Sequence, residues 1–276
     1  MALSGMTNLP PIWTLSAVVT DDGARLRYKV TGSGRADLVF VHGWASTRDY
    51  FDLVAAALDP AAFRLIAIDL RGHGQSEKGH RGFAAERHAR DILAVADAAG
   101  AQSFVTIGHS MGAKYSECVP ALAPGRVAGQ ILVAGAPAHA IPISDAELAE
   151  WTDLAGMAEE LYQSHGTTMS QPVAEPVRRA WAAAAAQIDA EVLRETLAIC
   201  FRTDAGESAA ASANRPVRIV AGANDPFFPP PMLADYAARK FGIAAPDLLD
   251  CGHEIPLERP HDLARIISDF CAALQG

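Results

Sequence analysis

The pentapeptide Gly108-His109-Ser110-Met111-Gly112 is the sequence feature that most limits how this chain can fold. It follows the apolar run 103–107, which predicts a buried strand, and it precedes residues 113–122, which predict a helix. A serine between glycines at such a junction is typical of a tight strand–turn–helix element that exposes a nucleophile. Small residues are needed on either side because the turn is tight and strained. We therefore expect the Ser110 hydroxyl to project into a reaction site, near a helix N-terminus that favours negative charge.

An acid and a histidine follow Ser110 along the chain, each just after a predicted strand. Asp225 lies in the turn after the apolar run 217–221, and His253 follows the run 247–250. The carboxyl ends of parallel strands meet at one edge of a sheet, so the three side chains can converge there. Serine needs a base to accept its proton, histidine titrates near neutral pH, and a carboxylate fixes the imidazole tautomer. The predicted roles are nucleophile for Ser110, general base and acid for His253, and orienting carboxylate for Asp225.

A fourth segment predicts the groups that would stabilise an oxyanion. The run 38–41 predicts a buried strand, and His42-Gly43-Trp44 follows it. In a strand–turn–helix element of this kind, called a nucleophile elbow, two backbone N–H groups hold the oxyanion. One belongs to the residue after the nucleophile, and the other comes from the loop after the third strand. These N–H groups are expected to belong to Met111 and Trp44. Two fixed donors of this kind can each lower the barrier by roughly 3 kcal/mol.

With these motifs the chain resembles the α/β-hydrolase superfamily, and within it the compact, esterase-like members that carry a helical cap. The resemblance runs from about Leu15 to the C-terminus and rests on 42–44, 69–76, 108–112, 222–225 and 252–253. It implies the triad and the oxyanion hole given above, and a mainly structural role for 69–76. Many relatives have a second glycine where this chain has Ala113, but alanine is small enough that no loss of activity is expected.

The remaining apolar runs predict an α/β fold with a mostly parallel, eight-stranded sheet covered by helices on both faces. The first two predicted strands form a hairpin through Asp21-Asp22-Gly23. Strands are expected near 15–20, 25–31, 38–41, 64–68, 103–107, 129–134, 217–221 and 247–250. Helices are expected near 48–58, 84–99, 113–122, 231–240 and 261–273.

Residues 138–214 break this alternation and predict a helical cap inserted after the sixth strand. The hydrolase core is then formed by 1–137 and 215–276, with 1–13 as a loose N-terminal arm. The helices of the insertion are expected near 145–157, 159–164, 173–188 and 190–201. A cap excludes water and shapes specificity, although any one apolar residue of it can instead pack the cap onto the core. The candidates to line the substrate pocket are Trp44, His109, Trp151, Leu154, Met157, Leu161 and Trp181, with Met169 and Phe201 as further cap residues.

Composition narrows the class of protein and of partner. A formal net charge of −9 without a run of Lys or Arg argues against nucleic acid and anionic membranes as partners. Residues 1–13 lack Lys and Arg and do not predict a signal peptide, and no apolar stretch is long enough to span a bilayer. The four scattered cysteines are expected to be free thiols. These features favour a cytoplasmic protein.

Other chemistries find less support in the sequence. Haloalkane dehalogenases and epoxide hydrolases share the fold but use a carboxylate nucleophile, and Ser110 occupies that position. No cluster has the spacing of metal ligands, so neither a metal nor another cofactor is expected. His80 and His88 are interpreted as a solvated pair, and Lys114 as a surface lysine of the helix after the elbow.

The sequence as a whole predicts a serine hydrolase that cleaves a small carboxylic ester through an acyl-enzyme, with water as the second substrate. The same triad would serve a lactonase, a C–C bond hydrolase, an amidase or a perhydrolase, which differ in pocket shape. A ligand receptor on a hydrolase fold with little turnover is the alternative from another class. The oligomeric state stays open.

Overall fold

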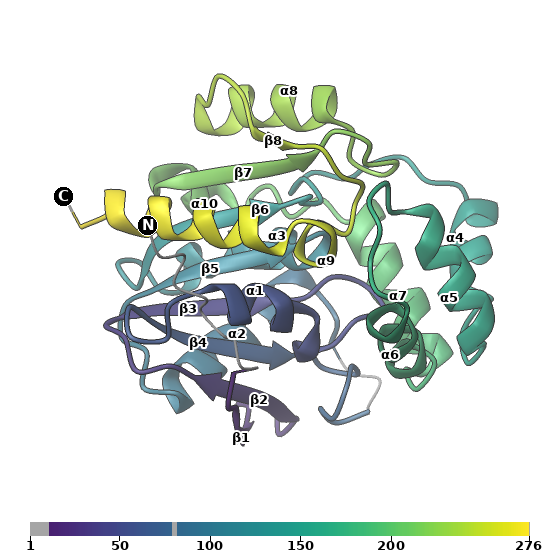
Figure 1. Cartoon of the computed structure of the whole chain (residues 1–276), viewed down its shortest axis with the longest axis horizontal. Coiled ribbons are helices and arrows are strands. Elements are labelled where there is room, and N and C mark those ends of the chain that lie inside the picture. The colour runs from purple at the N-terminus through teal and green to yellow at the C-terminus, as the bar shows by residue number, and fades with distance from the viewer. Residues whose placement is uncertain (1–10, 79–81, 276) are drawn as a thin grey trace, which may run out of the picture.

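The computed structural model describes residues 11–78 and 82–275, and its centre is one eight-stranded sheet in the order β1-β2-β4-β3-β5-β6-β7-β8 (Figure 1). The strands are β1 (Thr14–Val19), β2 (Arg25–Thr31), β3 (Ala36–Val41), β4 (Phe63–Asp69), β5 (Phe104–His109), β6 (Val127–Val133), β7 (Val217–Gly222) and β8 (Asp247–Leu249). The predicted hairpin pairs β1 with β2, and β2 continues antiparallel to β4. From β4 to β8 every neighbouring pair is parallel, which confirms the predicted fold class.

Alternating side chains of the strands divide the core into two layers. In β3, Val39 and Val41 face one layer, while Leu38 and Phe40 face the other. This alternation follows from the two-residue repeat of a strand, and apolar residues at every position are expected where both faces of a sheet are covered.

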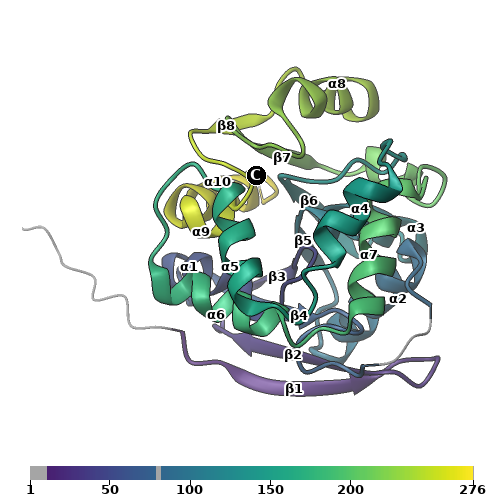
Figure 2. The ribbon, with the colours of Figure 1, turned by 90° about the vertical axis from the view of Figure 1, so that its right-hand side faces the viewer.

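Helices cover both layers, as Figure 2 shows. The first layer packs against α2 (Ala85–Ala98), α3 (Met111–Leu122) and α8 (Pro230–Phe241). The second packs against α1 (Asp52–Ala57), α9 (Ile255–Glu258) and α10 (Pro260–Ala273), with the short helix η1 (Arg48–Phe51) before α1. The predicted core helices are therefore all present, and α9 is an addition that is too short for apolar periodicity to reveal.

Four helices lie between β6 and β7, at the end of the sheet toward which the parallel strands point (Figures 1 and 2). They are α4 (Asp145–Thr152), α5 (Ala158–Thr167), α6 (Glu175–Ala185) and α7 (Ala190–Arg202), followed by the short helix η2 (Ala210–Asn214). We call residues 138–214 the insertion. Its helices pack around a small apolar cluster that includes Leu161, Ala182 and Val192, to which Ala45 and Phe83 of the core also belong. The first helix is five residues shorter at its C-terminal end than the sequence suggests, and Gly156, with φ of +80°, lies in the turn that follows.

Two predictions about polar residues are wrong, and both fail because distant elements cover the side chain. Lys114 is fully buried rather than exposed on the surface. His88 is also fully buried and stacks on Tyr115, with ring centroids 4.1 Å apart. Its expected partner His80 and most of the predicted N-terminal arm lie outside the described residues.

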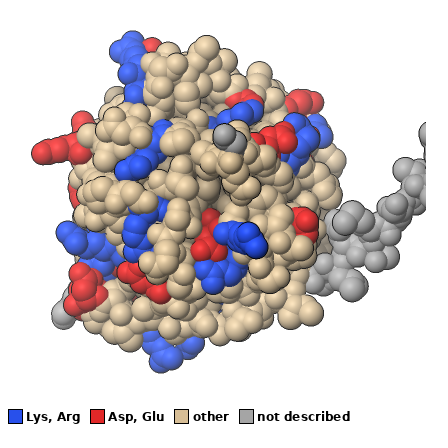
Figure 3. All heavy atoms as spheres, turned by 90° about the vertical axis from the view of Figure 1, so that its left-hand side faces the viewer, with Lys and Arg blue, Asp and Glu red and all other residues tan. Residues whose placement is uncertain are grey.

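Two features of the structure concern nucleic acid and membranes as partners: the distribution of surface charge, and the length and polarity of the helices. On the face seen in Figure 3, acidic and basic side chains are interspersed among uncharged ones. Within the described part of the chain, every helix is too short or too polar to cross a membrane.

Candidate active site

Ser110 lies at a strained turn between β5 and α3. Its backbone has φ of +52° and ψ of −121°, a conformation that L-residues rarely adopt. The two flanking glycines are required by close packing. A Cβ atom on Gly112 would lie 2.3 Å from the carbonyl oxygen of Val41, and one on Gly108 would lie 2.6 Å from the Cα atom of Ala113. The turn that the sequence predicted is therefore present, with Ser110 at its apex.

The structure brings Asp225 and His253 together from the loops after β7 and β8. His253 Nδ1 lies 2.8 Å from Asp225 Oδ2. The other carboxylate oxygen, Oδ1, accepts hydrogen bonds from the backbone N–H groups of Phe227 (2.8 Å) and Phe228 (3.1 Å). These bonds fix the orientation of the carboxylate, so that Nδ1 of the imidazole carries the proton and Nε2 is left as the basic nitrogen.

Burial and charge act in opposite directions on both members of this pair. Burial alone would raise the pKa of Asp225, but the attraction of His253 and the hydrogen bonds to the carboxylate lower it overall. Burial alone would lower the pKa of His253, but the negative charges of Asp225 and Glu254 raise it. The pair therefore stabilises the imidazolium that would form if His253 accepted a proton.

A second histidine supports the backbone of the first. His109 Nε2 donates a hydrogen bond to the carbonyl oxygen of His253 at 3.0 Å. Burial, together with repulsion from His253, lowers the pKa of His109 to about 4. His109 is therefore neutral near pH 7 and contributes geometry rather than charge. Its ring also packs against Tyr50, with centroids 4.9 Å apart.

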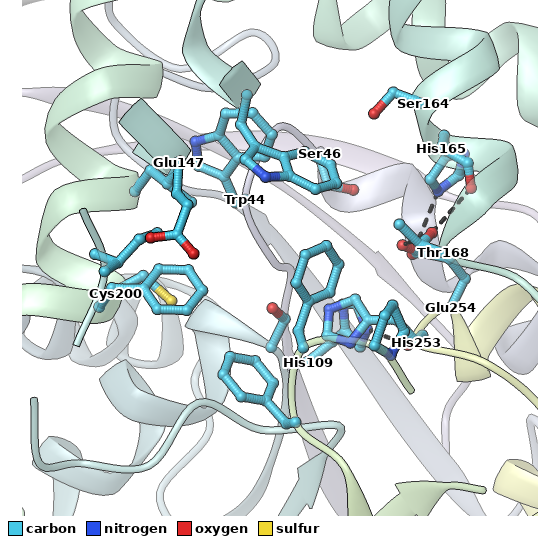
Figure 4. A pocket seen from close by; sticks show the side chains of 18 of the residues that line it. Trp44, Ser46, His109, Glu147, Ser164, His165, Thr168, Cys200, His253 and Glu254 are labelled. Carbon is cyan, nitrogen blue, oxygen red and sulfur yellow. Dashed lines mark hydrogen bonds and ion pairs between the residues drawn. The ribbon is translucent and has the colours of Figure 1, made fainter. Parts of the chain in front are cut away.

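Ser110 and His253 line one cavity of about 400 Å³ between the core and the insertion, shown in Figure 4. Much of its wall is aromatic, with Trp44, Trp151, Trp181, Phe201, Phe227 and Phe228. The indole N–H of Trp44 donates to the carbonyl oxygen of Leu193 in α7 at 2.8 Å, which ties the loop after β3 to the insertion. A cavity of this size, mostly apolar with a few polar groups, is typical of a small-molecule site.

Five of the seven predicted pocket residues line this cavity, namely Trp44, His109, Trp151, Leu161 and Trp181. Leu154 and Met157 are not among its lining residues. Leu154 packs into the apolar cluster of the insertion, and Met157 is 47 % exposed. Both follow the early end of α4 at Thr152, so the helical periodicity that would have turned them inward does not reach them.

Phe227, Phe228 and a polar group on one side of the cavity were missed from the sequence. The two phenylalanines come directly after Asp225-Pro226, and that proximity could have revealed them. The polar group consists of Tyr50, His165, Thr168 and Glu254, three of which are labelled in Figure 4. Its members come from three separate segments, namely η1, the C-terminal end of α5 and the residue before α9, so no single sequence motif identifies them.

Glu254 is the centre of this polar group. It accepts a hydrogen bond from the Tyr50 hydroxyl, and its Oε1 lies 2.9 Å from Thr168 Oγ1. Its Oε2 faces His165 Nε2 at 3.3 Å. Burial alone would raise the pKa of Glu254, but His165 and then His253 hold it well below the usual value. A buried, ionised carboxylate therefore lies next to His253 in the chain and joins α5 to the core.

Glu258 joins the insertion to the loop that carries His253. Its carboxylate accepts hydrogen bonds from the backbone N–H groups of Gly252 (3.0 Å) and Glu254 (3.1 Å). It also accepts from the N–H groups of Ser170 (2.8 Å) and Gln171 (2.7 Å), which lie between α5 and α6. The carboxylate of Glu258 thus satisfies four buried or half-buried donors from two distant segments. The same two segments are also joined by a backbone hydrogen bond, from the N–H of His253 to the carbonyl oxygen of Thr168 at 2.8 Å.

Lys114 has a similar role at the base of the insertion. Its ammonium group donates to the carbonyl oxygens of Cys200 (2.6 Å) and Thr203 (2.9 Å) at the end of α7, and to that of His139 at 3.4 Å. Burial lowers the pKa of this lysine. The helix that begins beside Ser110 is therefore bonded to both chain segments that connect the insertion to the core.

All four cysteines are free, as predicted, and buried. Burial raises the thiol pKa of Cys118, Cys200 and Cys251 to about 12, and that of Cys271 to about 11. None is poised as a thiolate nucleophile, although Cys200 lines the cavity. Among the described residues, no group of three or more His, Cys, Asp or Glu side chains could hold a metal ion.

The family model described as alpha/beta hydrolase fold matches residues 38–187, which include the Ser110 turn and much of the insertion. The chain belongs to the α/β-hydrolase fold family. The match, together with the sheet order and the Ser110 turn, confirms the family resemblance noted in the sequence.

Two curated relatives and one solved structure are similar to this chain. A non-heme haloperoxidase from Rhodococcus erythropolis is 36 % identical over 121 residues, or 44 % of each chain. A bifunctional esterase/perhydrolase from Acinetobacter calcoaceticus is 36 % identical over 96 residues, 34 % of this chain and 35 % of the relative. The matched part thus spans less than half the length of either relative. An esterase from Exiguobacterium antarcticum superposes with a TM-score of 0.79 at 19 % identity, covering 95 % of this chain and 99 % of that one.

Proposed function

We propose that this protein is a serine hydrolase that cleaves small carboxylic esters through an acyl-enzyme. The observation that carries the proposal is the 2.8 Å contact between His253 and Asp225 in a cavity that Ser110 also lines. Three residues of these types, on loops at one edge of a parallel sheet, match the requirements of nucleophilic acyl transfer. The matched portions of an esterase/perhydrolase and a haloperoxidase agree with chemistry of this kind.

In the first half of the reaction, Nε2 of His253 accepts the proton of the Ser110 hydroxyl while the oxygen attacks the ester carbonyl carbon. Asp225 keeps the Nδ1 proton in place and stabilises the imidazolium. The carbonyl oxygen becomes an oxyanion, and in this proposal the backbone N–H groups of Met111 and Trp44 stabilise it. Met111 is the first residue of α3, where N–H groups have no partner within the helix, and Trp44 lines the cavity beside Ser110.

The tetrahedral intermediate collapses when His253 returns its proton to the alkoxy oxygen of the substrate. The C–O bond of the ester breaks, the alcohol leaves, and the acyl group stays on Ser110. Water then gives a proton to His253, attacks the acyl carbon, and releases the acid while Ser110 recovers its proton. The insertion acts as a cap in this scheme, since the Trp44–Leu193 bond and the aromatic walls enclose the reacting groups.

The first test is hydrolysis of p-nitrophenyl butyrate by the wild type, Ser110→Ala and Ser268→Ala. Ser268 lies on α10, and its hydroxyl donates to the carbonyl oxygen of Ala264 in the preceding turn of the same helix, so it is the matched control. We expect Ser110→Ala to lose roughly a thousandfold or more in turnover, and Ser268→Ala to keep it. A fluorophosphonate probe should modify the wild type at Ser110 and leave the Ser110→Ala variant unmodified.

Retained activity in Ser110→Ala would place the nucleophile elsewhere and end the proposal. If activity instead depends on Ser110, a panel of lactones, amides, diketones and peracid-forming conditions separates the possible activities. It distinguishes a carboxylesterase from the lactonase, amidase, C–C hydrolase and perhydrolase that the same triad permits. Stoichiometric retention of an intact ligand, without turnover or probe labelling, would instead support a receptor.

A further inference from the structure

A second cavity, of about 350 Å³, lies between α6 of the insertion and the η1–α1 segment of the core. Its apolar walls are formed by Leu53, Val177, Ala180, Ala184 and Leu257. Its polar lining residues include Asp49 and Asp52, whose carboxylates are 66 % and 44 % exposed and both pair with Lys29. The cavity therefore has apolar walls, together with two partly exposed carboxylates that share Lys29 as their ion-pair partner.

Three residues belong to the walls of both cavities: Ser46, Tyr50 and Trp181. The two cavities are thus neighbours, and these side chains form the partition between them. Ser46 is small, and Tyr50 is held by its hydrogen bond to Glu254. Trp181, from α6, is the largest of the three and supplies the insertion's share of the partition.

The indole of Trp181 is held in place rather than loosely packed. It stacks on the His165 ring, with centroids 3.7 Å apart and planes inclined by 15°. His165 is itself fixed by the 3.3 Å contact of its Nε2 with Glu254, whose other oxygen lies 2.9 Å from Thr168 Oγ1. The chain of contacts from Glu254 through His165 to Trp181 therefore keeps the partition closed.

We propose that Trp181 sets the chain length of the substrate. This inference rests on the proposed function and adds its substrate class, namely esters with a short unbranched chain on the side of the scissile bond that faces α6. In the wild type the indole ends the path of that chain. When the indole is removed, the second cavity becomes an extension of the active site that accommodates a medium-length alkyl chain, because its walls are apolar. Each methylene group that enters such walls improves binding by roughly fourfold.

The test compares p-nitrophenyl esters from acetate to dodecanoate with the wild type, Trp181→Ala and Trp181→Leu. We expect kcat/KM of the wild type to fall beyond short chains. In the two variants, the ratio of kcat/KM for decanoate to that for butyrate should rise by about tenfold or more. Adding Ala184→Trp to Trp181→Ala refills the second cavity and should bring the ratio back. Thermal unfolding of each variant identifies any that fail to fold, and Trp181→Phe should retain the wild-type ratio because it keeps an aromatic ring on His165.

Chain length can also be tested without turnover, which separates this inference from the proposed function. The probes are 4-nitrophenyl alkyl ethers of increasing length, which cannot be hydrolysed as esters, and binding is measured by calorimetry. Affinity should level off at short chains in the wild type and keep rising with length in Trp181→Ala and Trp181→Leu. If ester hydrolysis is absent but this difference is found, the proposed function fails and the role of Trp181 stands. If hydrolysis occurs but the chain-length profiles of wild type and variants coincide, the role of Trp181 is overturned while the function stands.

Discussion

The two sides of the insertion are attached to the core in different ways. Between α5 and α6, the backbone at Thr168, Ser170 and Gln171 is hydrogen-bonded to the His253 loop or to the carboxylate of Glu258. On the other side, α4 contacts its surroundings through side chains. Trp151 packs edge-on against Trp44 and Phe227, at centroid distances of 6.3 Å and 5.0 Å.

The difference indicates that the insertion is not one uniform lid. The segment between α5 and α6 is part of the support for His253, the proposed general base, so moving it would disturb His253 itself. The α4 helix has an exposed ion pair with α7, from Asp145 to Arg202, and no such tie to the His253 loop within the described residues. Opening of the site for substrate is therefore expected on the α4 side, where side-chain contacts can be exchanged at small cost.

The largest effect is expected from Glu258→Ala, which removes the anchor of the α5–α6 side. Four backbone N–H groups lose a charged acceptor, so we expect a loss of about 3–5 kcal/mol in the free energy of unfolding. The kcat of ester hydrolysis should fall by about tenfold or more because the His253 loop is no longer held. Urea unfolding and steady-state kinetics measure the two effects.

Matched controls separate this anchor from an ordinary surface carboxylate. Glu77 also accepts one backbone N–H bond, from Arg25 at the start of β2, but it is exposed and lies near the opposite end of the strand order from β8. Glu77→Ala should therefore change stability and kcat much less than Glu258→Ala. Glu258→Gln, which keeps the shape but replaces one acceptor oxygen, should fall between the two. Equal effects of Glu258→Ala and Glu77→Ala would contradict the anchoring role.

An intermediate effect is expected in the pH dependence of kcat/KM. Burial lowers the pKa of His253, but Asp225 and Glu254 raise it above the usual value, so activity should fall as the pH drops through this raised pKa. Glu254→Gln removes one of the negative charges and should move this acid limb to lower pH. Glu147→Gln, which changes a cavity-lining carboxylate on α4, should leave the limb in place.

The contribution of Glu254 to folding stability depends on pH, and this limits the pH range in which the kcat/KM profile reports on His253. Its pKa is lowered in the fold, so its contribution to stability is present above the unfolded pKa of about 4.3 and is lost as the pH falls toward the folded value. Profiles taken above about pH 5 therefore report on His253. If Glu254→Gln and Glu147→Gln displaced the acid limb of the kcat/KM profile equally, the two sides of the insertion would not differ electrostatically.

The smallest effect is expected from Arg202→Ala on the α4 side. The pair with Asp145 is exposed, at 43 % for the arginine and 95 % for the aspartate, so its loss should cost about 0.5 kcal/mol or less. The kcat should stay within about twofold of the wild type. A double-mutant cycle with Asp145→Ala, followed by urea unfolding, measures the pair itself, and a coupling well above 1 kcal/mol would show that α4 is anchored after all.

The fold and the placement of Asp225 beside His253 could be predicted because their signals are local. Ser110 lies in a five-residue motif between a strand and a helix, and Asp225 and His253 each follow an apolar run that predicts a strand. Glu258 and His165 carry no comparable signal, because each depends on a partner far away in sequence. Glu258 accepts a hydrogen bond from the N–H of Ser170, and His165 faces Glu254. The serine's catalytic role and the oxyanion donors stay predictions.

Lys114 shows why local reasoning fails at particular positions. A lysine in a helix is usually exposed, since an unpaired buried ammonium group is costly. Here the carbonyl oxygens of Cys200 and Thr203 satisfy it, and they come from the end of a helix whose position depends on the whole insertion. Leu154 and Met157 illustrate the reverse error, because α4 stops before them and removes the face they would have shared.

The buried thiols have a practical consequence for studying motion of α4. With pKa values of about 11 and 12, the four native cysteines offer little thiolate to alkylating reagents near neutral pH. A cysteine introduced at the exposed Ala146 of α4 should therefore react selectively in the folded protein. A fluorophore or spin label can be attached there without first replacing native residues, which makes this helix directly accessible to spectroscopy.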